Sequence, residues 1–87
     1  MTKSRDEILD LLFRGVREVE GDAVAHVDRA DFPAAGPHDL NMDSLNLLEV
    51  EMMVSAELDQ EIEFPELRPG IRFDEIADAI VLKLQQL

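Results

Sequence analysis

Three stretches of the chain repeat apolar residues at the spacing of an α-helix, and this periodicity constrains the fold more than any other feature. The last stretch shows it most clearly, with steps of 3, 4, 4 and 3 between Phe73, Ile76, Ile80, Leu84 and Leu87. Such steps place the side chains on one helical face. Asp74 and Glu75 lie where the positive end of this helix dipole would be. We therefore predict a final helix with one buried face.

The first periodic stretch predicts a helix from Ser4 to about Glu20. Ser4 and Glu7 have the spacing of a capping box, in which two side chains bond the first free N–H groups. Gly21 offers a stop, and Gly15 in the middle allows another segment to approach closely. The apolar residues at helical spacing are Ile8, Leu9, Leu12, Val16 and Val19.

From Asp22 to Asp43 the helical period is lost, and a long first loop is expected. The segment from Asp31 to Asp39 has two prolines and a glycine in nine residues, which prevents a continuous helix. Loops of this length in compact domains are usually anchored by a few apolar side chains. The candidates are Val24, Val27, Phe32 and Leu40.

The second helix, from Ser44 to about Asp59, carries two apolar stripes. One stripe consists of Leu47, Val50, Val54 and Leu58, and the other of Leu45, Leu48, Met52 and Ala56. In a small domain the first stripe can face the core, and the second then lies exposed or half exposed. The alternative is a helix buried on two sides. Ser44 and Asp43 stand at its start, where either oxygen could cap free N–H groups; we expect Ser44 to contribute such a cap.

After this helix, Ile62 and Phe64 alternate with acidic residues. The segment from Pro65 to Gly70 can hold at most one helical turn, because Pro69 and Gly70 end it. The predicted fold is all-α, a small four-helix bundle of three long helices and one short one with a long first loop. At 87 residues the chain forms one domain, residues 1–87, with a single small core and no deep enclosed site.

Charge is the strongest bulk signal. The chain carries 20 acidic and 8 basic residues, a net charge of −12, and no basic residue stands between Arg29 and Arg68. Such a field repels nucleic acid and anionic lipid and favours basic protein surfaces. With no cysteine, and no apolar run long enough to span a membrane, we expect a cytoplasmic protein.

The residues of metal and catalytic sites are scarce. His26 and His38 are the only histidines, and no recognised ligand spacing surrounds them, so no metal site is predicted. There is no glycine-rich phosphate loop, and the carboxylates resemble a charged surface more than an acid–base pair. We do not expect an enzyme.

The sequence from Leu40 to Glu49 resembles the motif of acyl carrier proteins. Asp43-Ser44-Leu45 precedes an apolar helix, and the acidity, helix order and long first loop resemble that family over essentially the whole chain. The resemblance implies that Ser44 carries a covalent 4′-phosphopantetheine arm and that Asp43 helps present it. It also implies a partner-docking face that continues from Ser44 along the second helix, with the residues Leu45, Leu48, Glu49, Met52, Ser55 and Ala56.

The implied function is a monomeric, non-enzymatic carrier of acyl or aminoacyl thioesters. Its partners would be a phosphopantetheinyl transferase and acyltransferase, acyl-ligase or ketosynthase enzymes with basic surfaces. Fatty-acid carriers usually have further acids where Asn46, Ser55 and Ala56 stand, which favours polyketide or other specialised synthesis over primary fatty-acid synthesis. The family usually joins isoleucine directly to proline, whereas Glu63 and Phe64 separate them here. The alternative function is an acidic helical adaptor that binds a basic protein and carries nothing.

Overall fold

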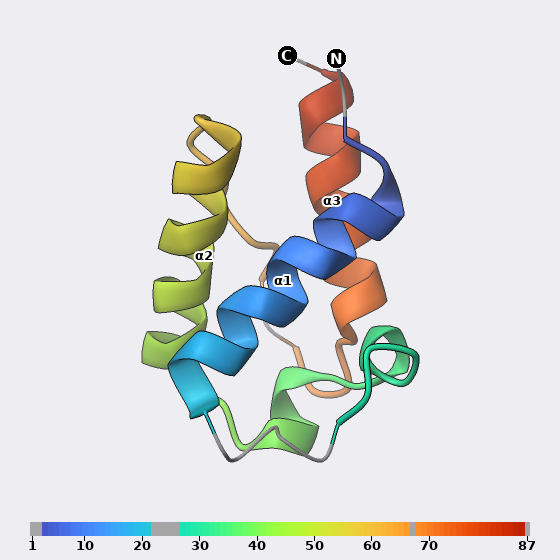
Figure 1. The fold of residues 1–87 in the computed structure, drawn as a ribbon, viewed down its shortest axis with the longest axis vertical. Helices are drawn as coiled ribbons and strands as arrows, with labels where there is room; N and C mark the ends of the chain where they lie inside the picture. Colours follow the sequence, from blue (N-terminus) through green and yellow to red (C-terminus); the bar gives the residue numbers. More distant parts are fainter. Residues whose placement is uncertain (1–2, 22–26, 67, 87) are drawn as a thin grey trace.

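The computed structural model describes residues 3–21, 27–66 and 68–86, and it is all-helical in these ranges (Figure 1). It contains three α-helices, α1 (Arg5–Glu20), α2 (Ser44–Leu58) and α3 (Phe73–Gln85), and two short 3₁₀ helices, η2 (Phe32–Ala34) and η3 (Pro37–Leu40). The described residues include no strand, so the predicted all-α class is confirmed. No helix in these ranges has the length and apolar character needed to cross a bilayer.

Helix α1 begins and ends as its sequence predicts. The Ser4 hydroxyl accepts the Glu7 N–H at 3.2 Å, and the Glu7 carboxylate accepts the Ser4 N–H at 3.1 Å. Gly21 ends the helix at a φ of 58°, a left-handed value that glycine adopts without a Cβ clash. The capping box and the glycine stop are both confirmed.

Helix α1 runs diagonally across the molecule and packs against both α2 and α3 (Figure 1). At its crossing with α2, a Cβ on Gly15 would lie 3.1 Å from a methyl group of Val50, which is tighter than ordinary contact. The missing side chain of Gly15 thus lets the two helices approach closely. Arg5 ties α1 to α3 by donating to Asp78 at 2.6 Å. Beneath these contacts the core contains Ile8, Leu12, Val16, Val50, Val54, Ile76 and Ile80.

The first loop is anchored by aromatic stacking. Phe32 is fully buried; its ring stacks on Phe73 at 4.3 Å and meets Phe13 edge-on at 5.1 Å. Leu40 is also buried and Val27 partly so, as predicted; Val24 lies outside the described residues. The Phe73 N–H donates to the Ala35 carbonyl at 2.8 Å, which fixes the loop against the start of α3.

The segment between α2 and α3 departs from the prediction. Residues 61–66 are not helical and residues 69–70 form a turn, so the short helix expected within Pro65–Gly70 is not found in the described residues; Leu67 lies outside them. The Phe64 N–H, just before this stretch, donates to the Glu51 carboxylate of α2 at 2.8 Å and fixes the start of the segment against α2. Leu87, expected on the α3 face, also lies outside the described residues, and α3 ends at Gln85.

Candidate functional site at the start and exposed face of α2

The chain enters α2 through a short anchored turn. Leu40 and Met42 are buried, and between them Asn41 adopts a left-handed backbone with a φ of 55°. Asparagine tolerates this region better than most residues. The Met42 N–H donates to the Pro37 carbonyl at 2.9 Å. Two buried side chains and one backbone bond therefore fix the position from which Asp43 and Ser44 emerge.

Asp43, not Ser44, caps α2. Asp43 Oδ1 accepts the Asn46 N–H at 2.9 Å, and Asn46 Oδ1 accepts the Asp43 N–H at 3.1 Å. Asp43 has the extended backbone of an N-cap, whereas Ser44 is the first helical residue. The expectation that Ser44 contributes the cap is therefore wrong, because the cap position lies one residue earlier. The capping role of Asn46 was not predicted, although its position three residues after Asp43 is that of a capping-box partner.

The Ser44 side chain is exposed, and its hydroxyl has no structural role among the described residues. The chain has three serines, and two are engaged in hydrogen bonds that stabilise the fold: Ser4 caps α1, and Ser55 Oγ accepts the Ile62 N–H at 3.0 Å and donates to the Ile62 carbonyl at 3.3 Å. Within the described part of the chain, the Ser44 hydroxyl makes no hydrogen bond. Ser44 is thus the serine that can be modified without breaking a contact seen here.

The two stripes of α2 face different environments, as predicted. Leu47, Val50 and Val54 are at most 3% exposed, and Leu58 is partly buried against the same core. On the other stripe, Leu45 is 62%, Leu48 48% and Met52 64% exposed. These are three of the four large apolar side chains most exposed in the described residues, the fourth being Leu82 on α3. An apolar surface therefore begins beside Ser44 and continues along α2.

The remaining residues expected on this face divide into two groups. Ala56, the last residue of the exposed stripe, and Glu49 beside it are both exposed. Ser55 is half-buried and bonded to Ile62, so the structure places it at the junction with the following segment and not on the exposed face.

A small hollow lies beside Ser44 on the side of α2 that faces the following segment. Its volume is about 180 Å³, and it is lined by Ser44, Leu47, Leu48, Glu51, Phe64 and Pro65. Cofactor and ligand pockets usually measure about 300–1,000 Å³. This hollow is therefore too small to enclose a large group.

In the part of the chain that the structure describes, the carboxylates of α2 form no ion pair with a cation of the protein. Arg5, Arg29, Arg68 and Arg72 form ion pairs with acids of α1 and α3, and Lys3 pairs with Glu7. None of the ion pairs found among the described residues involves an acid of α2. The face that carries Ser44 therefore keeps its negative charge available for a partner.

The histidines do not form a site in the described structure. His38 is exposed on η3, and His26 lies outside the described residues. Across residues 3–21, 27–66 and 68–86, no group of three side chains from His, Cys, Asp and Glu is arranged to hold a metal ion.

Comparison of the chain with models of protein families, with curated proteins and with solved structures found no match.

Proposed function

We propose that this protein is an acyl carrier protein whose Ser44 bears a covalent 4′-phosphopantetheine arm. The observation that carries the proposal is the environment of Ser44. Its exposed hydroxyl makes no hydrogen bond among the described residues, stands at the first position of α2 and borders an exposed apolar and acidic surface. The resemblance of Asp43-Ser44-Leu45 to the carrier motif gives this serine a chemical role.

The start of α2 suits a phosphodiester. The Asp43 carboxylate accepts the Asn46 N–H, and the Asp43 backbone carbonyl accepts the Leu47 N–H at 3.1 Å. The N–H groups of Ser44 and Leu45 precede these and find no acceptor within the described residues. Free N–H groups and the positive end of the helix dipole stabilise an added negative charge. This local field offsets part of the repulsion between a phosphodiester and the surrounding acids.

The chain itself supplies position and recognition, and the arm supplies reactivity. In the attachment step, the Ser44 hydroxyl gives its proton to a base of the transferase, and its oxygen forms the bond to phosphorus while coenzyme A loses its adenosine bisphosphate. The arm provides a thiol that holds acyl or aminoacyl groups as thioesters, chemistry that a chain without cysteine lacks. The protein therefore needs no catalytic residues of its own.

The partners we propose are enzymes with basic docking surfaces. They are a phosphopantetheinyl transferase and an acyltransferase, acyl ligase or ketosynthase, which would contact Leu45, Leu48, Glu49, Met52 and Ala56. The apolar character of this face favours polyketide or specialised metabolite synthesis over primary fatty-acid synthesis. The carrier would act in the cytoplasm and would be a monomer when free.

The experiment is incubation with coenzyme A, magnesium and a broad-specificity phosphopantetheinyl transferase, followed by intact-mass measurement. The expected gain is about 340 Da, the mass of the arm, which is attached through a phosphate as in a phosphoserine but is larger. Fragmentation should place this mass on Ser44, and Ser44→Ala should show none.

Ser4→Ala and Ser55→Ala are the matched controls, since each removes a serine hydroxyl but leaves Ser44, and both should load. An unmodified wild-type chain, or equal loading of Ser44→Ala, would contradict the proposal. The unpaired acids of α2 also favour the alternative function, an adaptor that binds a basic protein without any arm. Failure of loading combined with binding to a basic partner would select the adaptor.

A further inference from the structure

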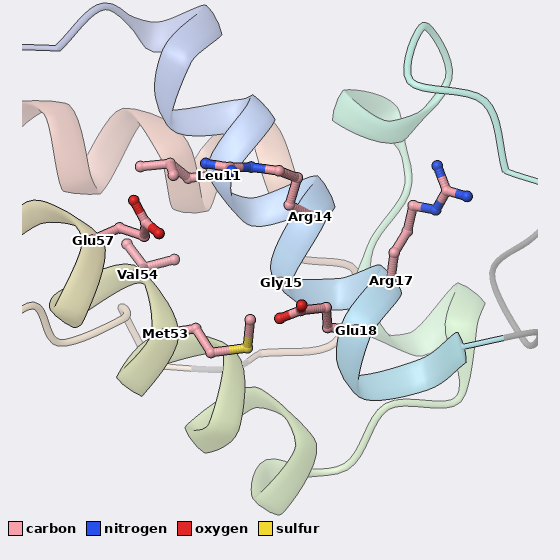
Figure 2. Close-up of a pocket in the computed structure, with 8 residues that line it drawn as sticks. All are labelled: Leu11, Arg14, Gly15, Arg17, Glu18, Met53, Val54 and Glu57. Carbon is pink, nitrogen blue, oxygen red and sulfur yellow. The ribbon is translucent and has the colours of Figure 1, made fainter.

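A groove between α1 and α2 continues from the exposed stripe of α2 onto α1. Its most enclosed hollow has a volume of about 310 Å³ (Figure 2). Two shallower hollows adjoin it, and Met53 lines all three. We call this the α1–α2 groove; it is lined by Leu11, Arg14, Gly15, Arg17, Glu18, Val19, Glu49, Met52, Met53, Val54, Ala56 and Glu57.

The floor of the α1–α2 groove is apolar and extended. Gly15 and Val54 are buried beneath it, and half-buried Met53 reaches from α2 toward Glu18 of α1 (Figure 2). Along α2 the groove spans residues 49 to 57, which is about 12 Å or two helical turns. A flexible thioether can adapt its shape to different apolar side chains. The length matches two or three anchors of a helix spaced at i, i+3 or i+4, and i+7.

The rim of the α1–α2 groove is negative. Glu18 on one side and Glu49 and Glu57 on the other make no ion pair within the described residues. Of the two nearby arginines, Arg17 points away from α2 and lies over the Phe13 ring at 5.5 Å (Figure 2). Arg14 and the stem of Arg17 line the same hollow. Three carboxylates against two guanidinium groups, one of them turned away from α2, leave the rim negative and favour a cationic occupant.

We infer that the α1–α2 groove binds an amphipathic helix of a partner protein, with leucine-like side chains on Met53 and lysine or arginine beside Glu18, Glu49 and Glu57. A second copy of this chain is a poor occupant, because each copy carries a charge of −12. The partner thereby contacts two helices, α1 as well as α2, and this contact does not require a modified Ser44.

The test uses the full chain with Ser44→Ala, so that no loading can contribute, and with ¹³C-labelled methionine methyl groups. The probe is a synthetic peptide of leucine and lysine, about four helical turns long, with leucines at helical spacing. The methyl signals of Met52 and Met53 should shift on addition of the peptide. The signal of Met42, which is 8% exposed in the core, should not shift, and its position also reports that each variant is folded.

A peptide of the same composition with the leucines out of helical register should bind at least about tenfold more weakly, since it cannot present one apolar face.

Charge-reversal variants distinguish peptide binding in the groove from non-specific attraction to the acidic chain. Glu18→Lys combined with Glu57→Lys should weaken the peptide about tenfold or more. The matched control, Glu61→Lys with Glu63→Lys, makes the same change in net charge at exposed positions outside the groove and should weaken it less than about twofold.

Three outcomes would overturn the inference. A shift of Met52 without Met53 would place the peptide on the α2 stripe alone. If both charge-reversed pairs weakened peptide binding equally, the binding would be non-specific electrostatic attraction to the acidic chain. A shift of Met53 that depends on protein concentration without peptide would make a second copy the occupant.

Discussion

Leu47 and Leu48 are neighbours in α2 with opposite environments, and truncating each to alanine tests whether the exposed stripe is a surface. Leu47 is 3% exposed and Leu48 is 48% exposed. Both changes remove the same three carbons from the same helix, so the change in intrinsic helix propensity cancels between them. The difference in stability then reports burial alone.

The expected magnitudes follow from that burial. Leu47→Ala should lower the free energy of unfolding by about 3 kcal/mol, because it removes core contacts and leaves a cavity. Leu48→Ala should cost less than about 1 kcal/mol, in the range of most surface substitutions. A gap of about 2 kcal/mol corresponds to about 8–16 °C in Tm for a chain of this size.

Urea and thermal unfolding followed by helical circular dichroism measures both changes. If the two stability losses differ by less than about 1 kcal/mol, α2 is buried on two sides and the docking face beside Ser44 must be abandoned. In the loading assay, the folded Leu48→Ala chain should show a lower kcat/KM than wild type, since the lost side chain belongs to the proposed contact.

Four further substitutions test the site, the loop and the first cap. Asp43→Ala should cost about 1 kcal/mol by removing the α2 cap, whereas Ser44→Ala should cost less than about 0.5 kcal/mol; urea midpoints of the two variants would show the reverse order if Ser44 were the cap. Gly36→Ala should cost more than about 2 kcal/mol, because its Cβ would overlap the Ile71 carbonyl oxygen, and an unchanged Tm would contradict this packing. Hydrogen bonding to the backbone N–H of the α1 cap lowers the pKa of Glu7 from 4.5, so the ionised carboxylate stabilises the folded chain above this pH and the contribution is lost as the pH falls. Between about pH 5 and pH 3, wild type should therefore lose more stability than Glu7→Gln, and parallel urea midpoints would exclude the effect.

The helices were predictable because their signals are local. The capping box at Ser4 and the glycine stop at Gly21 involve residues a few positions apart, and apolar periodicity identifies a buried face without knowledge of the neighbouring element. The same periodicity identified the two stripes of α2, but it left open whether the helix is buried on one side or on two; the resemblance to carrier proteins favoured one exposed stripe. Even Gly15 was interpretable as a point of close approach, which Val50 occupies.

What the sequence did not reveal depends on contacts between distant residues. The Phe64 N–H donates to the Glu51 carboxylate thirteen residues earlier, and this contact holds the backbone just before the Pro65–Gly70 segment, where a short helical turn was expected. The α1–α2 groove likewise requires the crossing of two helices. Met53 belongs to neither apolar stripe of α2, so periodicity gave no reason to select it.

Whether the N-cap of α2 falls on Asp43 or on Ser44 determines whether the Ser44 hydroxyl is bonded to the backbone. Both side chains are good caps, so the sequence alone could not assign the cap position. The buried Met42 and the left-handed Asn41 fix the register by placing Asp43 at the cap and Ser44 one residue inside α2. Had Ser44 been the cap, its oxygen would be bonded to the backbone, and any modification there would cost helix stability. Because Asp43 caps the helix, the Ser44 hydroxyl can react while the helix that supports it remains intact.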